Sequence, residues 1–278
     1  MTTRVLVLRL TGPLQAWGSA SLFNRRETDL WPSKSGIVGL LAAAQGRRRT
    51  DPIEDLLSLS LGVRIDQAGS VLRDYHTVST LDGEPLLSAS INAKGQQRPN
   101  SAKKTTAVTE RFYLQDALFV AAVEGPPDLI EGLAYAVSHP TFPLYLGRRS
   151  CAPGRPPLVR DGDAGTWDPD VRRVLRTVPW LGRPARPGRV PATLPVVFDF
   201  DPEIDPPERA EERADVPVSF APTERAWTTR RVIADWVSPP GLATDENGTA
   251  PTDCNPPQGD DSSVVFAPAT FNDFDLVE

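Results

Sequence analysis

The chain begins with a short apolar run that is typical of a buried strand. In residues 3–10 (TRVLVLRL) leucines occupy alternate positions and valines the positions between them. Successive side chains of a strand point to opposite faces, so this pattern places leucines on one face and valines on the other. Gly12 and Pro13 end the run. The pattern predicts a strand that is covered on both faces.

Apolar residues recur at helical spacing in three later segments, which end or begin at proline, serine or glycine. They predict helices from Pro32 or Ser33 to about Ala44, over 52–61, and between Pro126 and His139. Extended segments with strand-like composition lie between and after them. These predicted strands are 63–67, 70–80, 106–114, 117–123, 195–200 and 226–237.

The order of these elements is strand, helix, strand, long insertion, strand, helix, strand. That order predicts an α+β fold of the ferredoxin-like or RRM-like type, with a protruding thumb β-hairpin. The insertion at 81–104 is polar and too long for an ordinary hairpin loop, so we expect it to form the tip of the thumb.

Composition divides the chain into three regions. Residues 1–150 hold the predicted RRM-like domain, and 151–237 form a Pro/Arg-rich extension whose short strands predict a small C-terminal β-rich subdomain. Residues 238–278 carry eight acidic residues, no basic ones and six prolines. We expect this acidic tail to be disordered, because it has too little apolar surface to offset the entropy of ordering.

The net charge of −6 hides an asymmetry along the chain. Residues 1–198 carry 25 Lys+Arg and 18 Asp+Glu, whereas residues 199–278 carry 5 and 18. A basic body with an acidic tail predicts an anionic partner for the body. Most of the basic residues are arginine, whose planar fork binds phosphate in two places, although a GC-rich genome also favours arginine codons.

Several classes of function are disfavoured by the residue inventory. No stretch is long and apolar enough to span a membrane. Cys151 and Cys254 fit no zinc spacing and indicate a reducing, cytoplasmic setting with no metal site or cofactor. His76 and His139 are the two histidines of the chain, which excludes most histidine-based active sites.

The first candidate binding motif combines GPLQAWG at 12–18 with WPSKSG at 31–36. A helix that begins with Ser-Lys-Ser-Gly offers free amides, hydroxyls and an ammonium to a phosphate at its positive end. The alternative is an ordinary serine N-cap. The candidate RNA-binding residues here are Gln15, Trp17, Arg25, Arg26, Ser33, Lys34 and Ser35.

The second motif is LRDYHTV at 72–78. Tyr75 and His76 beside Arg73 could act as general acid and base in RNA cleavage, or could stack on a base and clamp a phosphate without chemistry. A packed strand with a hydrogen-bonded histidine is the alternative. Lys103, Lys104 and Arg111 are further candidate RNA contacts on the predicted thumb.

The third motif is YLGRRSC at 145–151. A glycine beside two arginines lets the backbone approach a polyanion while both guanidiniums bind it, although a solvated basic loop is also possible. Cys151 fits a small buried residue better than a nucleophile, since it has no evident base. The candidate residues are Tyr145, Gly147, Arg148, Arg149 and Ser150.

Together, the strings LxGPLQAWG, PSKSGIVGLLAAAQG, LRDYHTV and YLGRRSC resemble the CasD family of RAMP-superfamily subunits in type I-E CRISPR Cascade complexes. The resemblance is strongest from about Val5 to Cys151 and weaker to about Val237. It implies an RRM-like domain with a thumb and a glycine-rich loop, in a subunit whose role is to cap the 5′ handle of the crRNA. It also implies contacts with the backbone and large Cascade subunits, and with target DNA only through the complex.

Three functions are therefore compared. The leading hypothesis is a non-catalytic RNA-binding subunit of Cascade that contributes to antiviral defence. The alternative is a metal-independent endoribonuclease that processes CRISPR repeat RNA with Tyr75 and His76. A third is a scaffold that contacts protein neighbours and little RNA, which leaves the basic excess of the body unexplained.

Overall fold

A computed structural model describes residues 2–18, 25–80, 105–162, 165–183, 191–221 and 225–238, and residue 240. The chain divides into two units, Met1–Ala243 and Thr244–Glu278, and every element below belongs to the first. The predicted thumb tip at 81–104 and almost all of the predicted acidic tail lie outside the described residues.

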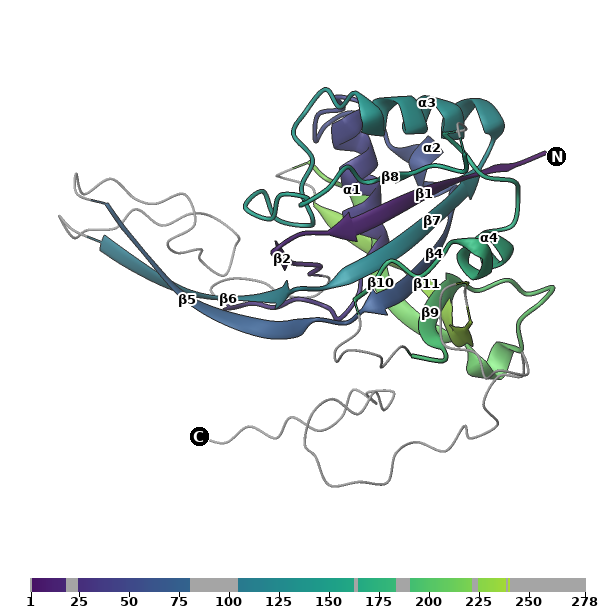
Figure 1. Ribbon diagram of the computed structural model, residues 1–278. Helices are drawn as coiled ribbons and strands as arrows, with labels where there is room; N and C mark the ends of the chain where they lie inside the picture. The colour runs from purple at the N-terminus through teal and green to yellow at the C-terminus, as the bar shows by residue number, and fades with distance from the viewer. Residues whose placement is uncertain are drawn as a thin grey trace, which may run out of the picture. The chain divides into compact units, whose positions relative to one another are not determined.

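The fold is a mixed α+β, strand-rich arrangement around a seven-stranded sheet in the order β10-β11-β9-β4-β7-β1-β8 (Figure 1). Strands β1, β7 and β4 are antiparallel neighbours at its centre. The strands of this sheet are β1 (Arg4–Thr11), β4 (Ser60–Gln67), β7 (Leu118–Gly125), β8 (Leu158–Val159), β9 (Leu194–Asp199), β10 (Glu211–Ser219) and β11 (Ala226–Val237).

Helices cover both faces of this sheet (Figure 1). One face packs against α1, α2 and α3, and the other packs against α4. The alternation predicted for β1 is confirmed, because its leucines lie in the first core and Val5 and Val7 in the second. The helices are α1 (Lys34–Ala44), α2 (Glu54–Leu57), α3 (Pro127–Ser138), α4 (Val171–Thr177) and a 3-10 turn, Pro207–Arg209.

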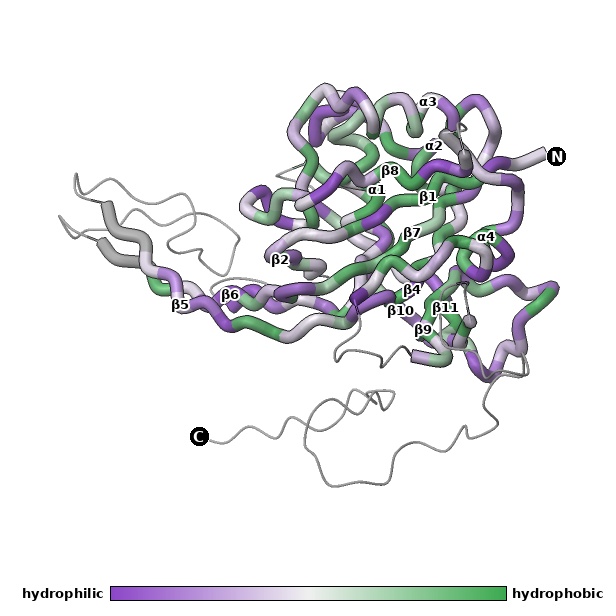
Figure 2. The backbone as a smooth tube through the Cα atoms, viewed as in Figure 1, coloured by the Kyte–Doolittle hydropathy of each residue, from purple (hydrophilic) through white to green (hydrophobic). Residues whose placement is uncertain are grey.

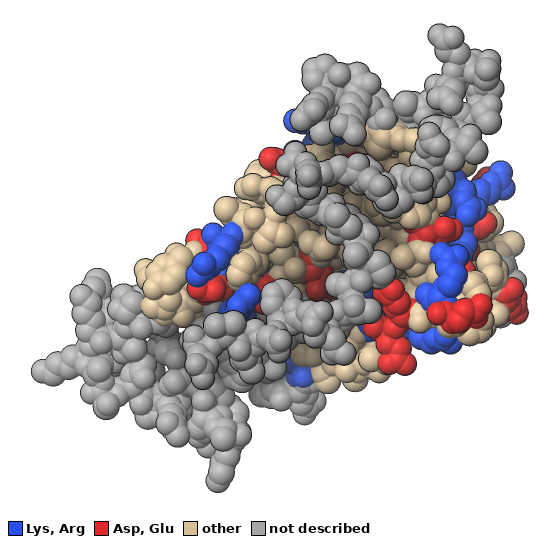
Figure 3. Space-filling model, turned by 90° about the horizontal axis from the view of Figure 1, so that it is seen from below, with Lys and Arg blue, Asp and Glu red and all other residues tan. Residues whose placement is uncertain are grey.

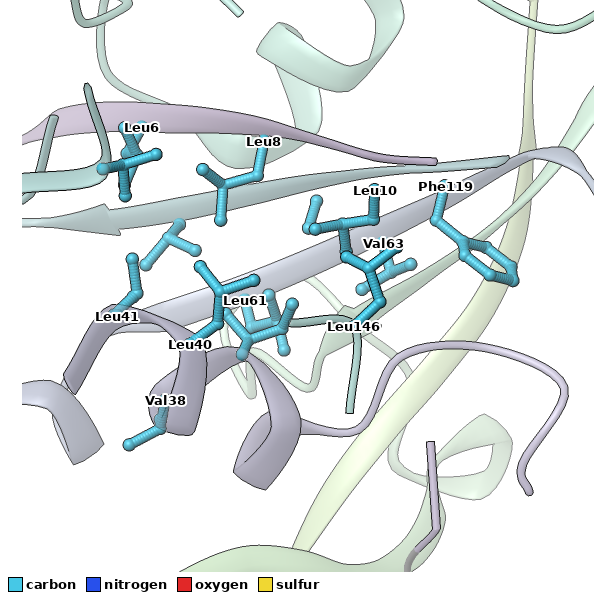
Figure 4. Packing of buried hydrophobic residues seen from close by; sticks show 14 of the residues in the cluster. Leu6, Leu8, Leu10, Val38, Leu40, Leu41, Leu61, Val63, Phe119 and Leu146 are labelled. Atoms are coloured by element: carbon cyan, nitrogen blue, oxygen red, sulfur yellow. The ribbon is translucent and has the colours of Figure 1, made fainter. Parts of the chain in front are cut away.

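The first core joins the N-terminal motifs to the later strands. Leu40 and Leu41 of α1 face the leucines of β1, and Leu146 and Phe119 lie at the far end of the same cluster (Figure 4). Each of these side chains is at most 1% exposed. Burying one large aliphatic side chain stabilises the fold by roughly 1.5–3 kcal/mol, so this cluster fixes the loop around Leu146 against β1.

A second, smaller sheet carries the protruding hairpin. Strands β5 (Ser70–Thr80) and β6 (Thr105–Gln115) pair in antiparallel register along their whole length and extend away from the helices and the main sheet (Figure 1). Near its base, β2 (Leu14–Gln15) and β3 (Arg25–Arg26) also pair with β6. Hydrophilic and hydrophobic positions interleave along this hairpin, unlike the continuous apolar run of β7 (Figure 2).

The structure differs from the sequence-based predictions at three elements. The predicted C-terminal strands do not form a separate subdomain, because β9 pairs with β4 and extends the main sheet. The helix predicted over 52–61 ends at Leu57, and Ser60 already pairs with Glu124 in the sheet. Helix α4 was not predicted at all, since its surroundings are rich in Pro, Gly and Arg.

Candidate RNA interface

The N-terminus of α1, predicted as a phosphate site, is filled by the protein itself. Ser33 is an ordinary N-cap, which was the alternative to a phosphate site. Its Oγ accepts a hydrogen bond from the Gly36 amide at 3.2 Å. The Lys34 amide donates to Asp215 Oδ2 at 2.9 Å, and Lys34 Nζ donates to Asp199 at 3.1 Å. Ser33, Lys34 and Ser35 are all buried. The phosphate prediction is therefore wrong here, because a carboxylate already occupies the positive end of the helix.

That carboxylate belongs to a buried ionic network. Arg230 binds Asp215 through two nitrogens, at 2.6 and 2.8 Å, and also pairs with Asp199. Arg213 contacts Asp215 at 3.2 Å. Burial raises the pKa of Asp215, but the hydrogen bonds and charge of Arg230, with the Lys34 amide and Arg213, outweigh burial and hold that pKa below its usual value. The network ties α1 to β9, β10 and β11.

Gln15 and Trp17 are buried as well, at 0% and 1% exposure. The Gln15 amide donates to the carbonyls of Leu10 and Ala117 at 3.1 and 2.7 Å. Its oxygen accepts from the Trp17 indole at 3.0 Å. Both were predicted to contact RNA, yet their side chains are enclosed by protein. They connect β1, β2 and β7 instead.

The glycine-rich loop at 145–151 packs directly on the GPLQAWG segment. Gly147 has φ +83°, a conformation that side chains other than glycine rarely adopt. A Cβ on Gly147 would lie 1.7 Å from the Ala16 carbonyl oxygen. The Ala16 amide also donates to the Leu146 carbonyl at 3.1 Å. Two of the predicted motifs are thus brought together, and this contact requires glycine.

Arg148 is held by backbone carbonyls. Its guanidinium donates to the Phe112 carbonyl at 3.1 Å and the Arg26 carbonyl at 2.8 Å, and lies 4.7 Å from the centre of the Tyr113 ring. These bonds join the loop to β6 and β3. The predicted role of Arg148 as a free phosphate clamp is therefore only partly available, because several of its donors are already used. Arg149, next in the chain, is exposed.

The positive charges of three other arginines act on Arg26, and we call the four residues the arginine cluster: Arg26, Arg111, Arg148 and Arg225. Arg26 is the register partner of Arg111 on β6, and Arg148 donates to the Arg26 carbonyl at 2.8 Å. Burial lowers the pKa of Arg26 most, and the positive charges of Arg111, Arg148 and Arg225 lower it further. Arg111 Nε is buried with no hydrogen-bond partner among the described residues. The charges that act on Arg26 have the same sign and repel it, so a bound polyanion would relieve this repulsion.

Strand β5 carries Arg73, Tyr75 and His76, and it pairs with β6, the strand of Arg111. Arg73 pairs with Glu110 across the hairpin, and Tyr75 is 63% exposed. His76 Nδ1 is 3.9 Å from Asp74. Because Tyr75 and His76 are consecutive in a strand, their side chains project to opposite faces of the hairpin. They do not converge as a general acid and base would need to in order to act on one phosphate.

The other predicted residues are distributed differently. Tyr145 is half-buried and Ser150 is exposed, while Lys103 and Lys104 lie outside the described residues. Cys151 is a buried free thiol, and burial raises its pKa, which matches the prediction of a packing residue.

Sequence reasoning missed Asp199, Asp215 and Arg225. Asp199 and Asp215 bind Lys34, and the charge of Arg225 acts on Arg26. All three lie far along the chain from these partners, and no local pattern marks them. Basic and acidic residues are unevenly distributed along the sequence, but the surface of the folded chain is not uniformly of one charge. On the face shown in Figure 3, described Lys and Arg side chains lie beside Asp and Glu.

Within the described part of the chain, no three His, Cys, Asp or Glu side chains are grouped so that they could hold a metal ion. No helix there is long and apolar enough to cross a membrane.

Comparisons with known proteins agree with this arrangement. CRISPR system Cascade subunit CasD of Escherichia coli (strain K12) is 37% identical over 161 residues, which cover 52% of this chain and 66%, just under two thirds, of that protein. A chain of a solved CRISPR RNA-guided surveillance complex superposes with a TM-score of 0.65 at 33% identity, covering 85% of this chain and 91% of that one. A crystal structure of a Cas protein gives a TM-score of 0.59 at 31% identity, covering 84% and 95%. The family model for CRISPR-associated protein (Cas_Cas5) matches residues 5–233. The chain belongs to this CRISPR-associated Cas5 family.

Proposed function

We propose that this chain is a non-catalytic RNA-binding subunit of a type I-E CRISPR surveillance complex, Cascade, acting in the cytoplasm. It caps the 5′ handle of the crRNA, contacts the backbone and large subunits, and meets target DNA only through the complex. The observation that carries the proposal is the arginine cluster beside the hairpin, where Arg26 is paired in register with Arg111 and hydrogen-bonded through its carbonyl to Arg148. The similarity to a Cascade subunit and to a chain of an RNA-guided complex supports it.

The RNA-contacting surface in this proposal is smaller than the sequence suggested. It comprises side chains that are at least partly accessible around the hairpin base and the glycine-rich loop: Arg25, Arg26, Arg73, Tyr75, Arg111 and Arg149. Arginine binds phosphate through its fork, and an exposed tyrosine can stack on a base, so this set suits a single-stranded RNA.

The proposed core is ferredoxin-like. Read from β8 through β1 and β7 to β4, the sheet has the strand order of a split β-α-β fold, with α1 after β1 and α3 after β7. Strands β9 to β11 extend this core at the β4 edge. The hairpin of β5 and β6 is the proposed thumb, and its exposed apolar side chains suit contact with an adjacent subunit. They include Val71, Leu72 and Val108.

The test is incubation of the full chain with labelled CRISPR repeat RNA in EDTA, read on both native and denaturing gels. We expect a retarded band on the native gel and intact RNA on the denaturing gel. Opposite projection of Tyr75 and His76 supports the absence of cleavage. A sharp cleavage product that disappears in a His76→Ala variant would overturn the proposal in favour of the endoribonuclease.

A further inference from the structure

A second basic site lies outside every residue predicted to contact RNA. It is a cleft of about 720 Å³ between the end of β1, the segment after the glycine-rich loop and the segment after α4. Three arginines, Arg9, Arg155 and Arg183, line it together with Trp180. One carboxylate, Asp116, also lines it, so positive charge exceeds negative charge. Ligand pockets of roughly 300–1,000 Å³ hold a molecule the size of a nucleotide.

The arginines of this cleft have unused donors. Arg9 donates from Nη2 to the Pro156 carbonyl at 3.2 Å, but its Nε is buried without a partner in the described structure. Arg155 and Arg183 are exposed, and neither forms an ion pair with a described residue. Burial, and then the charge of Arg155, lower the pKa of Arg9. An anion in the cleft would satisfy these groups.

The Trp180 wall of the cleft is rigid. The Trp180 indole donates to the Asp66 carbonyl at 3.0 Å, and the Leu181 amide donates to Asp66 Oδ2 at 2.8 Å. Asp66 is itself fixed by the fully buried Arg64 at 2.6 Å. A Cβ on Gly182 would lie 2.4 Å from the indole nitrogen, so glycine allows the chain to close around the ring.

The opposite wall is fixed by backbone contacts. The Gly154 amide donates to the Thr11 carbonyl at 2.8 Å, and a Cβ on Gly12 would lie 2.6 Å from the Ala152 carbonyl. Both walls are therefore held in place before any ligand binds. A site that is already ordered binds at a lower cost in conformational entropy.

We propose that this cleft holds one nucleotide of single-stranded RNA, with its phosphate on Arg155, Arg183 and Arg9 and its base against Trp180. The combination of an aromatic ring with guanidiniums that keep unused donors among the described residues fits a nucleotide, because a base stacks on the ring while the phosphate binds the arginines. The inference rests on the proposed function and adds a second RNA contact to it. The contact is independent of base sequence, since none of its partners reads a base edge.

The test compares the full chain with an Arg155→Ala/Arg183→Ala variant. Binding to a handle RNA and to a scrambled RNA of equal length is measured by fluorescence anisotropy from low to high salt. The loss of this phosphate contact should lower the slope of log affinity against log salt by up to about 0.7 on both RNAs. Binding to single-stranded DNA of the handle sequence is measured in the same way. The fold-loss of affinity that the variant shows for this DNA should be no larger than the fold-loss that it shows for the RNA.

Two control variants separate this site from general charge effects. Arg173→Ala/Arg176→Ala removes the same charge from exposed positions on α4 and should leave the slope unchanged. Arg155→Lys/Arg183→Lys should retain most of the slope. An unchanged slope in the cleft variant, an equal loss in the α4 variant, or a loss confined to DNA would overturn the inference. Thermal melts confirm that each variant is folded.

A crosslinking experiment tests the base. Irradiation of the full chain with 5-iodouridine-substituted RNA should give an adduct on Trp180, and adducts that omit Trp180 would overturn the base assignment. If the wild type binds the handle RNA and the scrambled RNA equally well, the handle-binding function is rejected. The salt slope of the cleft variant then still tests whether the cleft binds RNA. If it binds neither RNA, both proposals are rejected.

Discussion

The backbone amide of Lys34 donates a 2.9 Å hydrogen bond to Asp215, a residue that lies 181 positions further along the chain. The first turn of α1 is thereby satisfied by a carboxylate of β10 rather than by a ligand. A helix N-terminus favours negative charge, and here the protein supplies it. Because this contact occupies the start of α1, the candidate RNA surface lies at the arginines at the base of the hairpin instead.

Asp215→Asn should destabilise the fold by about 3 kcal/mol at pH 7, because the buried Arg230 loses one of its two charged partners. The folded pKa of Asp215 is lowered, so its contribution is present above the unfolded value near 3.8 and is lost as the pH falls through the folded value. The difference in unfolding free energy between wild type and variant should therefore shrink below about pH 4. Urea unfolding at several pH values measures it.

A matched control is Asp168→Asn, whose carboxylate is 78% exposed in its pair with Arg4. Exposed pairs contribute about 0–1 kcal/mol, so this variant should unfold almost like wild type. A difference for Asp215→Asn that stays constant from pH 7 to pH 2 would contradict the role of its charge.

Gly147→Ala should disrupt the contact between the two glycine-containing segments. The added Cβ would lie 1.7 Å from the Ala16 carbonyl oxygen, at a φ of +83° that alanine avoids. We expect a loss of more than about 1 kcal/mol in stability, since both strain and a clash are introduced. Differential scanning calorimetry provides the measurement.

Gly132→Ala in α3 is the corresponding control. Nothing lies within 4 Å of a Cβ at Gly132, and alanine is the better helix former. This substitution should raise stability by roughly 0.5–1 kcal/mol. Equal melting temperatures for the two variants would show that Gly147 is not constrained as described.

The adjacent residues Arg148 and Arg149 should behave differently when replaced by alanine. Arg148→Ala removes hydrogen bonds to the Phe112 and Arg26 carbonyls, so it should lower stability by about 1–3 kcal/mol. Arg149→Ala should leave the melt unchanged and lower the salt slope of RNA binding by about 0.7, the value of one phosphate contact. A lower salt slope for Arg148→Ala together with lower stability for Arg149→Ala would show that Arg148 is the RNA contact.

Local signals predicted much of the fold. The N-terminal strand, the helix that Ser33 caps and the strand at 226–237 were all identified, because each carries its own periodicity or boundary residue. Helix α4 escaped notice because it is only seven residues long, in a segment whose proline and glycine content indicates irregular structure. Short helices are stabilised by tertiary packing, which a local pattern does not report.

The candidate site was less predictable than the fold. The motifs around Gly147 and Trp17 pack against each other, but several of their polar side chains bind protein atoms. Whether an arginine or a helix N-terminus is free depends on partners such as Asp215 that are distant in sequence. The clustering of Arg26 with Arg225 depends on the fold in the same way.

Recognition of the crRNA handle is measured by the binding of the full chain to handle RNA and to a scrambled RNA of the same length and composition. The measurement is equilibrium fluorescence anisotropy at physiological salt, with both RNAs labelled at the 3′ end so that the 5′ end stays free. We expect the handle RNA to bind at least about tenfold more tightly than the scrambled RNA, a difference of roughly 1.4 kcal/mol. Equal affinities for the two RNAs, or no binding to either, would contradict it.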